Sequence, residues 1–305
     1  MPSAGPVIST GVVEAAPAKI NLALHVTGRR EDGYHLLDSI VTFAEAGDRL
    51  TFAAASEDSL SLSGRFGATL AADPKGTGDN LVTKARDLLR EALSSRGLDT
   101  PPVEITLEKN LPIASGIGGG SADAAATLRG LLRLWNADLP ASDLAAVALR
   151  LGADVPMCLE SRPLRASGIG EAITPLPHMP SFAMVLANPL KAVSTPEVFR
   201  RLDRKDNPPI SSPPQVADHE AWIAWLSTLR NDLEVPARAL LPEIGDVCDM
   251  LAGSGAAFVR MSGSGATCFG LYGDYAAARA AVSHLSRQQP RWYFEATRTV
   301  AGETS

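Results

Sequence analysis

Residues 111–126 have the sequence Leu111-Pro112-Ile113-Ala114-Ser115-Gly116-Ile117-Gly118-Gly119-Gly120-Ser121-Ala122-Asp123-Ala124-Ala125-Ala126. Four glycines fall within five positions, and an alanine-rich pattern typical of a helix follows through Trp135. Glycine lets a ligand approach the backbone N–H groups, and a helix start adds free donors and a partial positive charge. The junction therefore favours a phosphate site. The alternative is a flexible turn before a helix that Ser121 caps.

Two familiar phosphate loops are excluded at this stretch. No Gly-Lys dipeptide occurs in the chain, so the lysine of a Walker A loop is absent. The glycines also fail the pattern G-x-G-x-x-G, because Ser121 occupies the sixth position counted from Gly116. A phosphate loop here would take its cation from another part of the chain.

Length and charge bound the class of protein. The chain has 305 residues, which is enough for one large or two ordinary domains. Its net charge of −6 argues against a nucleic-acid or anionic-membrane partner. An anionic small molecule is still compatible, because it needs only a local positive field.

Cysteine usage and the N-terminus both predict a cytoplasmic protein. Cys158, Cys248 and Cys268 are odd in number and have apolar neighbours, which favours buried thiols in a reducing compartment. Residues 1–10 are expected to form a loose tail, without the basic start and apolar core of a signal peptide. No apolar run reaches transmembrane length.

The spacing of apolar residues predicts alternating strands and helices around the glycines. We expect strands at 12–18, 22–26, 36–44, 103–107, 172–176, 182–187, 258–261, 268–272 and 292–297, and further strands within 49–72. We expect helices at 81–96, 121–135, 195–202, 219–230, 242–252 and 275–287. One more, ending at residue 151, is expected to be capped by Ser142 or Asp143. Asn80 is expected to cap the first helix, and Pro196 suits the first turn of another.

Four polar side chains outside the glycine stretch are candidates for a site. Lys19 lies between apolar residues and either extends outward from a strand end or points an ammonium into a site. Tyr34 and His35 end a polar loop and either pack at a strand start or contact a ligand. Asp154 is either a turn residue or a carboxylate held in a cleft, where it could accept a hydrogen bond from a hydroxyl.

A second stretch of small residues lies between two expected strands, at Ser262-Gly263-Ser264-Gly265-Ala266-Thr267. It is either the turn of a hairpin or a second loop lining a site. Its six residues exceed what a tight hairpin turn needs.

Three stretches in order along the chain resemble the GHMP kinase superfamily of small-molecule kinases: Pro17-Ala18-Lys19-Ile20-Asn21, Gly116–Ser121 and Ser262-Gly263-Ser264-Gly265. A closer resemblance is to the branch that acts on cytidine diphosphate-linked methylerythritol. It rests on Ala18-Lys19-Ile20-Asn21-Leu22, Asp32-Gly33-Tyr34-His35, Asp79-Asn80-Leu81, Gly152-Ala153-Asp154-Val155-Pro156, Gly168-Ile169-Gly170-Glu171 and Asn231-Asp232-Leu233-Glu234.

The resemblance implies a fold and an activity. The fold is α+β with two domains: residues 1–163, like ribosomal protein S5 domain 2, would bind ATP and carry out catalysis, and residues 164–305 would be ferredoxin-like. The activity is transfer of the γ-phosphate of ATP, with Mg²⁺, to the 2-hydroxyl of that substrate in the non-mevalonate isoprenoid pathway. A cytoplasmic monomer or homodimer is expected, with neither nucleic acid nor membrane as partner.

The resemblance also implies roles for individual residues. Asp154 would orient or deprotonate the hydroxyl, and Lys19 would be the neighbouring cation. The substrate would be held by Asn21, Tyr34, His35, Thr195 and Phe199, with His35 against the cytosine. ATP would be bound by Pro112, Ile113, Ala114, Ser115, Gly116, Ile117, Gly118, Gly119, Gly120, Ser121 and Ala122, with Asn80 and Lys109 near the adenosine. The motifs do not identify ligands for the magnesium.

Two positions depart from the family pattern, and two alternatives remain open. Ala122 replaces a serine that many members carry, and Asp123 stands where asparagine is frequent. A carboxylate near a triphosphate repels it unless it faces magnesium or solvent. The alternatives are another kinase of the superfamily, for homoserine or a mevalonate derivative, and a non-catalytic nucleotide-binding protein of the S5 type.

Overall fold

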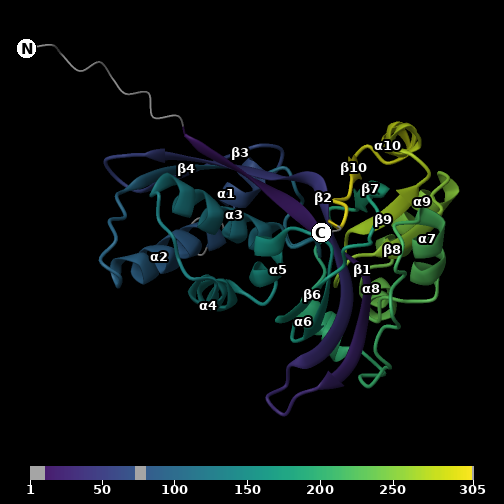
Figure 1. The fold of residues 1–305 in the computed structure, drawn as a ribbon. Coiled ribbons are helices and arrows are strands. Elements are labelled where there is room, and N and C mark those ends of the chain that lie inside the picture. Colours follow the sequence, from purple (N-terminus) through teal and green to yellow (C-terminus); the bar gives the residue numbers. More distant parts are fainter. Residues whose placement is uncertain (1–10, 73–79, 304–305) are drawn as a thin grey trace, which may run out of the picture. The chain divides into compact units, whose positions relative to one another are not determined.

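The structure is a computed structural model that describes residues 11–72 and 80–303 (Figure 1). The expected tail at residues 1–10, and Asp79 of the expected helix start, lie outside the described residues.

Segments of two compact units alternate along the chain. The first unit contains Met1–Ala16, Asp48–Leu111 and Gly120–Leu159, and the second contains Pro17–Gly47, Pro112–Gly119 and Glu160–Ser305. The glycine-rich residues 112–119 thus belong to the second unit, and the segments directly before and after them belong to the first. The predicted domain division after residue 163 lies near the last of these boundaries and stays a prediction.

Two long paired strands contribute residues to both units: β1 (Val12–Arg29) and β2 (His35–Ala54). The two extended segments expected within residues 12–26 are parts of one continuous strand, β1. The polar loop between them is reduced to a turn at residues 30–34, in which Gly33 has a φ of +94°.

The first unit has helices on a small sheet. It holds β3 (Ser59–Ser63), α1 (Gly67–Ala72), α2 (Leu81–Ser94), β4 (Val103–Glu108), α3 (Gly119–Leu134), α4 (Ala141–Leu151) and α5 (Val155–Glu160), of which α3 begins and α5 ends one residue outside it. Strand β4 lies between β3, which is parallel to it, and the second half of β2, which is antiparallel.

Three local predictions for the first unit were wrong. Residues 67–72 form the helix α1 and not a strand, because the alternation ends at Ser63 and the following alanines favour a helix. Helix α4 begins at Ala141, directly after Pro140, and no side chain caps it. Ser142 instead donates its hydroxyl proton to Asp143 at 3.3 Å. Helix α3 starts at Gly119, two positions before the expected Ser121.

Helix α3 packs closely on the sheet of the first unit because its buried face is made of small residues. A Cβ added to Gly130 would lie 2.2 Å from the ring of Phe52 on β2, so no other residue fits there without displacement. Ala122, Ala124, Ala125 and Ala126 are all buried. This packing fixes the helix that follows the glycine-rich loop.

The second unit contains two antiparallel groups of strands and the remaining helices. These elements are β5 (Leu164–Gly168), β6 (Ala172–Pro175), β7 (Ala183–Asn188), α6 (Thr195–Arg200), α7 (His219–Ser227), α8 (Glu234–Leu240), α9 (Glu243–Gly253), β8 (Phe258–Met261), β9 (Cys268–Tyr272), α10 (Tyr275–Gln288) and β10 (Tyr293–Arg298). β5 pairs with the first half of β2 and with β6. The other sheet has the order β10-β7-β9-β8.

That order confirms a ferredoxin-like arrangement in the second unit. Along the chain, β7, helices, β8, β9, α10 and β10 follow the pattern β-α-β-β-α-β. Helices α9 and α10 supply the apolar residues of its core, among them Val247 and Leu285. Beyond β10 the chain returns to β2, where Thr299 forms an antiparallel bridge with Ala44 and Val300 N donates to Phe43 O at 2.8 Å.

The three cysteines are buried, as predicted, and none forms a disulfide within residues 11–72 and 80–303. Cys248 on α9 and Cys268 on β9 are in contact, with 3.4 Å between their sulfur atoms. Both belong to the core of the ferredoxin-like part.

Candidate active site

Two loops of small residues pack backbone to backbone in the second unit. We call residues Pro112–Gly119 the glycine loop and Ser262–Thr267 the serine loop. Thr267 N donates to Ser115 O at 3.0 Å, and the Ser262 hydroxyl donates to Gly116 O at 3.1 Å. The serine loop does connect the paired strands β8 and β9, but it also supports the glycine loop. The segment is therefore the turn of a hairpin that also contacts the glycine loop, and its role in lining a site stays a prediction.

Glycine is required where these loops meet. Gly116 has a φ of +76°, and a Cβ on it would lie 2.6 Å from Gly265 O. A Cβ on Gly263, at a φ of +54°, would lie 2.7 Å from Gly116 O. These contacts hold the two backbones closer together than any side chain would allow.

Lys19 lies along the glycine loop. Its backbone N–H donates to Ile117 O at 2.9 Å, and the residue is 5% exposed. A Cβ on Gly118 would lie 3.1 Å from Lys19 Cβ and 3.3 Å from Lys19 Cε, so the lysine stem runs against the loop backbone. The loop thus has a cation beside it that comes from far upstream, in place of a Walker lysine.

Asn21 links the same loops and retains an open acceptor. Its backbone N–H donates to Ser262 Oγ at 3.0 Å, and its side-chain Nδ2 donates to Ser39 Oγ at 2.8 Å. Its Oδ1 is buried and has no hydrogen-bond partner among the described residues. A buried acceptor without a partner costs free energy unless a ligand supplies the donor. The side chain is therefore suited to a hydroxyl of a bound molecule.

His35, the residue predicted to lie against the cytosine, is the first residue of β2. The rings of His35 and Phe199 are stacked, with 4.7 Å between centroids and 26° between planes. Burial, and then the charges of Arg29 and Lys205, lower the pKa of His35, so the imidazole is neutral at neutral pH. Its Nε2 is buried without a partner in the described part of the chain. Tyr34 beside it is 63% exposed.

Helix α6 carries the other two predicted substrate residues, Thr195 beside the serine loop and Phe199 beside His35. Ser194 caps this helix by accepting from Glu197 N, and the hydroxyls of Thr195 and Ser264 lie 2.7 Å apart. Pro196 lies in the first turn, as expected. Phe199 follows one turn later and carries the ring stacked on His35.

Apart from Lys109, the predicted site residues of the first unit lie at or next to helix starts. Asn80 caps α2, as expected, with its Oδ1 accepting from Val82 N at 2.9 Å. Asp154 is half-buried directly before α5, and its carbonyl accepts from Cys158 N at 3.1 Å. Ser121 and Ala122 lie near the start of α3. Asp154 and Lys19 belong to different units, so their joint action stays a prediction.

Lys109 is buried between two aspartates. Its ammonium donates to Asp123 Oδ2 at 2.7 Å and to Asp48 Oδ2, and Lys109 itself is 4% exposed. Asp48 Oδ1 also accepts from the backbone N–H groups of Asn110 and Leu111, at 2.6 and 2.8 Å. The position of Lys109 near the adenosine stays a prediction. Its contacts indicate that it joins Asp48 of β2 to Asp123 of α3.

The surroundings of this cluster shift the pKa values of Asp123 and Lys109. Burial, reinforced by Asp48 and opposed by Lys109, raises the pKa of Asp123 to about 7. Burial alone would lower the pKa of Lys109, but Asp123 and Asp48 outweigh it and raise that pKa. The carboxylate of Asp123 therefore faces the ammonium of Lys109. The sequence had suggested that it would face either magnesium or solvent.

Comparison with known proteins gives the family. The model of the GHMP kinases N terminal domain matches residues 80–162, and that of the GHMP kinases C terminal domain matches residues 216–291. The chain belongs to the GHMP kinase family.

Relatives and solved structures agree with this assignment. A protein from Rhizobium etli named 4-diphosphocytidyl-2-C-methyl-D-erythritol kinase is 61% identical over 302 residues, which are 99% of each chain. A crystal structure of 4-(cytidine 5'-diphospho)-2C-methyl-D-erythritol kinase superposes with a TM-score of 0.77 at 34% identity, covering 95% of this chain and 100% of that one. A homoserine kinase from Cytophaga hutchinsonii has a TM-score of 0.65 at 18% identity, over 99% and 98% of the chains, and shows the fold alone.

Membership makes this GHMP kinase an ATP-dependent phosphotransferase with a small-molecule acceptor. No helix in the described ranges is long and apolar enough to cross a membrane. Within the same ranges, no three His, Cys, Asp or Glu side chains converge as a metal site.

The motif Asn231-Asp232-Leu233-Glu234 supports the serine loop of this GHMP kinase, a role that its sequence alone did not reveal. Asn231 Nδ2 donates to the carbonyls of Met261 and Gly263, both at 2.8 Å. Glu234 Oε2 accepts from Met261 N at 3.0 Å. The motif was conspicuous in the sequence, but its partners lie about thirty residues further on, so its function required the fold.

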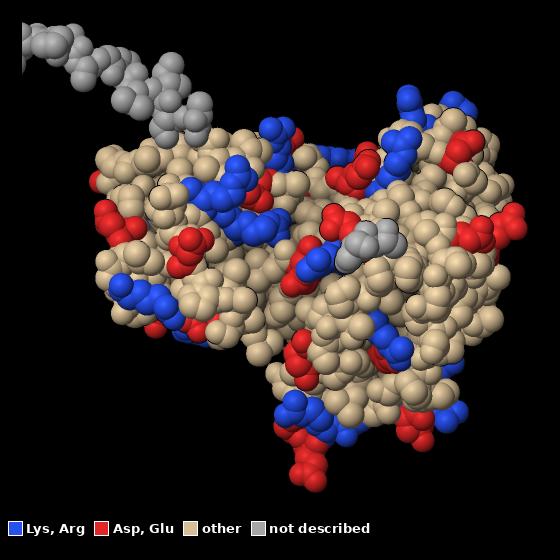
Figure 2. All heavy atoms as spheres, viewed as in Figure 1, with Lys and Arg blue, Asp and Glu red and all other residues tan. Residues whose placement is uncertain are grey.

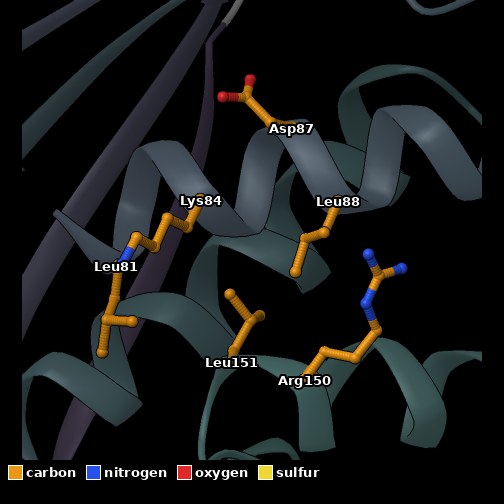
Figure 3. A pocket seen from close by; sticks show the side chains of 6 residues that line it. All are labelled: Leu81, Lys84, Asp87, Leu88, Arg150 and Leu151. Carbon is orange, nitrogen blue, oxygen red and sulfur yellow. The ribbon is translucent and has the colours of Figure 1, made fainter. Parts of the chain in front are cut away.

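A hollow of about 260 Å³ lies between α2 and α4 in the first unit (Figure 3). Leu88 and Leu151 point toward one another across it, and Arg150 lies at its edge (Figure 3). None of the predicted site residues lines it, although Leu81 follows Asn80 directly. It carries no part of the proposed chemistry.

Replacing Gly116 with alanine should damage the loop contact itself. We expect Gly116→Ala to lower the unfolding temperature and raise the Kd for ATP at least tenfold, because the new Cβ would meet Gly265 O at 2.6 Å. Thermal unfolding and calorimetric titration with ATP measure the two effects. Gly97→Ala is the matched control, since Gly97 has nearly the same φ, +74°, but nothing within 4 Å of the added atom. Equal effects of the two variants on ATP binding would contradict the prediction.

Proposed function

We propose that this GHMP kinase transfers the γ-phosphate of ATP to the 2-hydroxyl of 4-diphosphocytidyl-2-C-methyl-D-erythritol, in the non-mevalonate isoprenoid pathway. The stacked pair of His35 and Phe199 carries this proposal, because a neutral imidazole with an open nitrogen matches the edge of a cytosine. The names of the relatives at 61% and 34% identity support it.

On this proposal the glycine loop and the start of α3 bind the ATP phosphates through backbone N–H groups. Positive φ angles at Gly116 and Gly118 are compatible with such a cradle. The proposed ATP residues are Pro112, Ile113, Ala114, Ser115, Gly116, Ile117, Gly118, Gly119, Gly120, Ser121 and Ala122, with Asn80 near the adenosine.

The chemistry assigned to the side chains is positioning and charge stabilisation, as phosphoryl transfer requires. Asp154 accepts the proton of the attacking hydroxyl, and the hydroxyl oxygen forms the new bond to the γ-phosphorus. The bond between that phosphorus and the bridging oxygen of ADP breaks. Lys19, beside Gly118, stabilises the negative charge on the transferring group.

Magnesium is proposed to enter with the nucleotide. Mg²⁺ in kinase sites keeps several waters and is bound by one or two carboxylates together with substrate phosphates. Asp123, the first carboxylate after the glycine loop in sequence, is engaged by Lys109 and buried. The protein would then supply few of the ligands of Mg²⁺, and the ion would neutralise the charge of the ATP phosphates.

An acceptor screen tests the function. ADP release is measured with ATP, Mg²⁺ and each of three acceptors: the cytidylated methylerythritol, homoserine and mevalonate. We expect turnover with the first alone, and phosphorus NMR of the product to show a new phosphomonoester. Turnover with homoserine or mevalonate alone would reverse the choice of substrate. ATP binding without turnover of any acceptor would favour a non-catalytic protein.

Removing the His35 ring should act on the acceptor and not on ATP. We expect His35→Ala to raise the KM for the cytidylated acceptor at least tenfold, because the stacked and hydrogen-bonding partner of the base is lost. The KM for ATP should stay within about twofold of wild type, since His35 belongs to no part of the proposed phosphate cradle. Initial rates at varied acceptor concentration measure this. His284→Ala, which alters an exposed histidine on α10, is the control.

The remaining expectations concern the oligomeric state, the partners and the cellular location of the protein. We propose a cytoplasmic monomer or homodimer that binds neither nucleic acid nor membrane. The net charge of −6 supports this, and on the face shown in Figure 2 basic side chains are interspersed with acidic ones. Sedimentation of the purified protein, with and without added DNA, tests both points.

A further inference from the structure

The cluster of Asp48, Lys109 and Asp123 ties together the two ends of the glycine loop. The loop leaves the first unit after Leu111 and returns at Gly120. Asp48 holds the outgoing end through the N–H groups of Asn110 and Leu111. Lys109, two residues before Leu111, reaches Asp123 near the start of α3. A single ammonium therefore joins the strand before the loop to the helix after it.

The backbone of Lys109 is fixed as firmly as its side chain. Its N–H donates to Ser63 O and its carbonyl accepts from Phe66 N, both at 2.8 Å. A Cβ on Gly64 would lie 2.8 Å from both Lys109 N and Lys109 O, so the end of β3 packs directly on this residue. The backbone from which the Lys109 ammonium extends is thus held by hydrogen bonds and by packing.

Burying a second carboxylate here is unfavourable for stability. Two aspartates share one lysine, and all three residues are at most 4% exposed. Asp123 Oδ1 is buried with no hydrogen-bond partner among the described residues. Ionised groups in such surroundings lower the folded-state stability unless fully paired. The buried carboxylate of Asp123 therefore points to a role other than stability.

We propose that Asp48, Lys109 and Asp123 act as a brace that sets the geometry of the glycine loop and so determines the affinity for ATP. These residues are positioning residues, because their buried charged groups are bonded to one another and to the backbone beside the loop. The inference rests on the proposed binding of the ATP phosphates by the loop. It replaces a direct contact of the Lys109 ammonium with adenosine by an action through the backbone.

The brace predicts that one substitution lowers the affinity for ATP without lowering the stability. In Asp123→Ala the helix start loses its link to Lys109, and we expect the Kd for Mg·ATP to rise about tenfold, the loss of one charge-assisted hydrogen bond. At pH 8 the same change removes an ionised buried carboxylate, so the urea midpoint of unfolding should not fall. Asp123→Asn keeps an oxygen that can accept from Lys109 and should restore the Kd to within about twofold of wild type.

Glu14→Gln provides a matched control on the same helix. Glu14 pairs with Arg129 and Arg133 of α3, well beyond the brace. We expect this variant to unfold at lower urea concentration while its Kd for Mg·ATP is unchanged. Calorimetric titration measures the Kd without any acceptor, so the result does not depend on the identity of the second substrate.

The pH dependence gives a separate readout. Because the pKa of Asp123 is raised to about 7, the stability it contributes is present below its ordinary pKa and is lost as the pH rises through 7. Among residues 11–72 and 80–303, the charged groups that face its carboxyl are Lys109 and Asp48. The urea midpoint of wild type relative to Asp123→Asn should therefore fall between pH 5 and pH 7 and be constant above pH 8.

The outcomes separate the brace from the ATP assignment. A raised Kd in Asp123→Ala, an unchanged Kd in Glu14→Gln and recovery in Asp123→Asn support the brace. An unchanged Kd in Asp123→Ala, with Gly116→Ala still impaired, overturns the brace alone. An unchanged Kd in both Asp123→Ala and Gly116→Ala overturns the brace together with the proposed phosphate loop.

Discussion

Asp154→Asn is expected to lower kcat by roughly 10²–10⁴-fold, the usual contribution of a general base. The amide has the size of the carboxylate and keeps one acceptor oxygen, but it cannot take the proton of the acceptor hydroxyl. Because Asp154 has no part in the proposed phosphate cradle, the KM for ATP should stay within about twofold of wild type. Coupled ADP release with the cytidylated acceptor measures both constants.

The control for this variant is Asp138→Asn, which changes an exposed aspartate just before α4. It should be as active as wild type. A kcat for Asp154→Asn within tenfold of wild type would remove Asp154 from the chemical step. A loss of kcat with a matching loss of thermal stability would instead mark it as a residue that supports the turn before α5.

Lys19→Met is expected to reduce kcat/KM by roughly 10²–10³-fold, as removal of one electrostatic stabiliser of a transition state does. Methionine keeps an unbranched stem of similar length, so the packing against Gly118 survives and only the ammonium is lost. The change should appear in kcat, because the ammonium is proposed to act on charge that develops during transfer.

Lys191→Met serves as the comparison for Lys19→Met. Lys191 forms an ion pair with Glu243 in the same unit, and its side chain is 57% exposed, so its loss should leave kcat unchanged. Near-wild-type turnover of Lys19→Met would show that the cation of the reaction comes from another residue. Circular dichroism at the assay temperature verifies that both variants are folded.

The sequence predicted those features whose causes are local. The cap of α2 by Asn80, the first-turn proline of α6 and the strands before and after the serine loop follow from residues within one or two turns of each other. The second small-residue loop could be recognised because it has more residues than a tight hairpin turn. Such short-range rules also suggested Ser142 or Asp143 as a cap, where the helix in fact begins after Pro140.

Contacts between distant residues could not be predicted in this way. Asp48 precedes Lys109 by 61 residues, and Asn21 is 241 residues from the Ser262 hydroxyl that accepts its N–H. Neither Asp48 nor Ser262 has a distinctive sequence pattern that points to its partner. The unusual feature that could have been followed was Asp123 itself, since a carboxylate next to a phosphate loop requires a counter-charge nearby.

The bridge between Thr299 and Ala44 has a consequence for how the protein folds. β10 completes the ferredoxin-like sheet and the residues after it join β2, so a late segment of the sequence pairs with an early one. Pairing between residues so far apart in sequence is slow to form, because the entropy of closing the intervening chain is lost first. Until that pairing forms, the edge of β2 near Ala44 is available to other chains, which raises the risk of aggregation during folding.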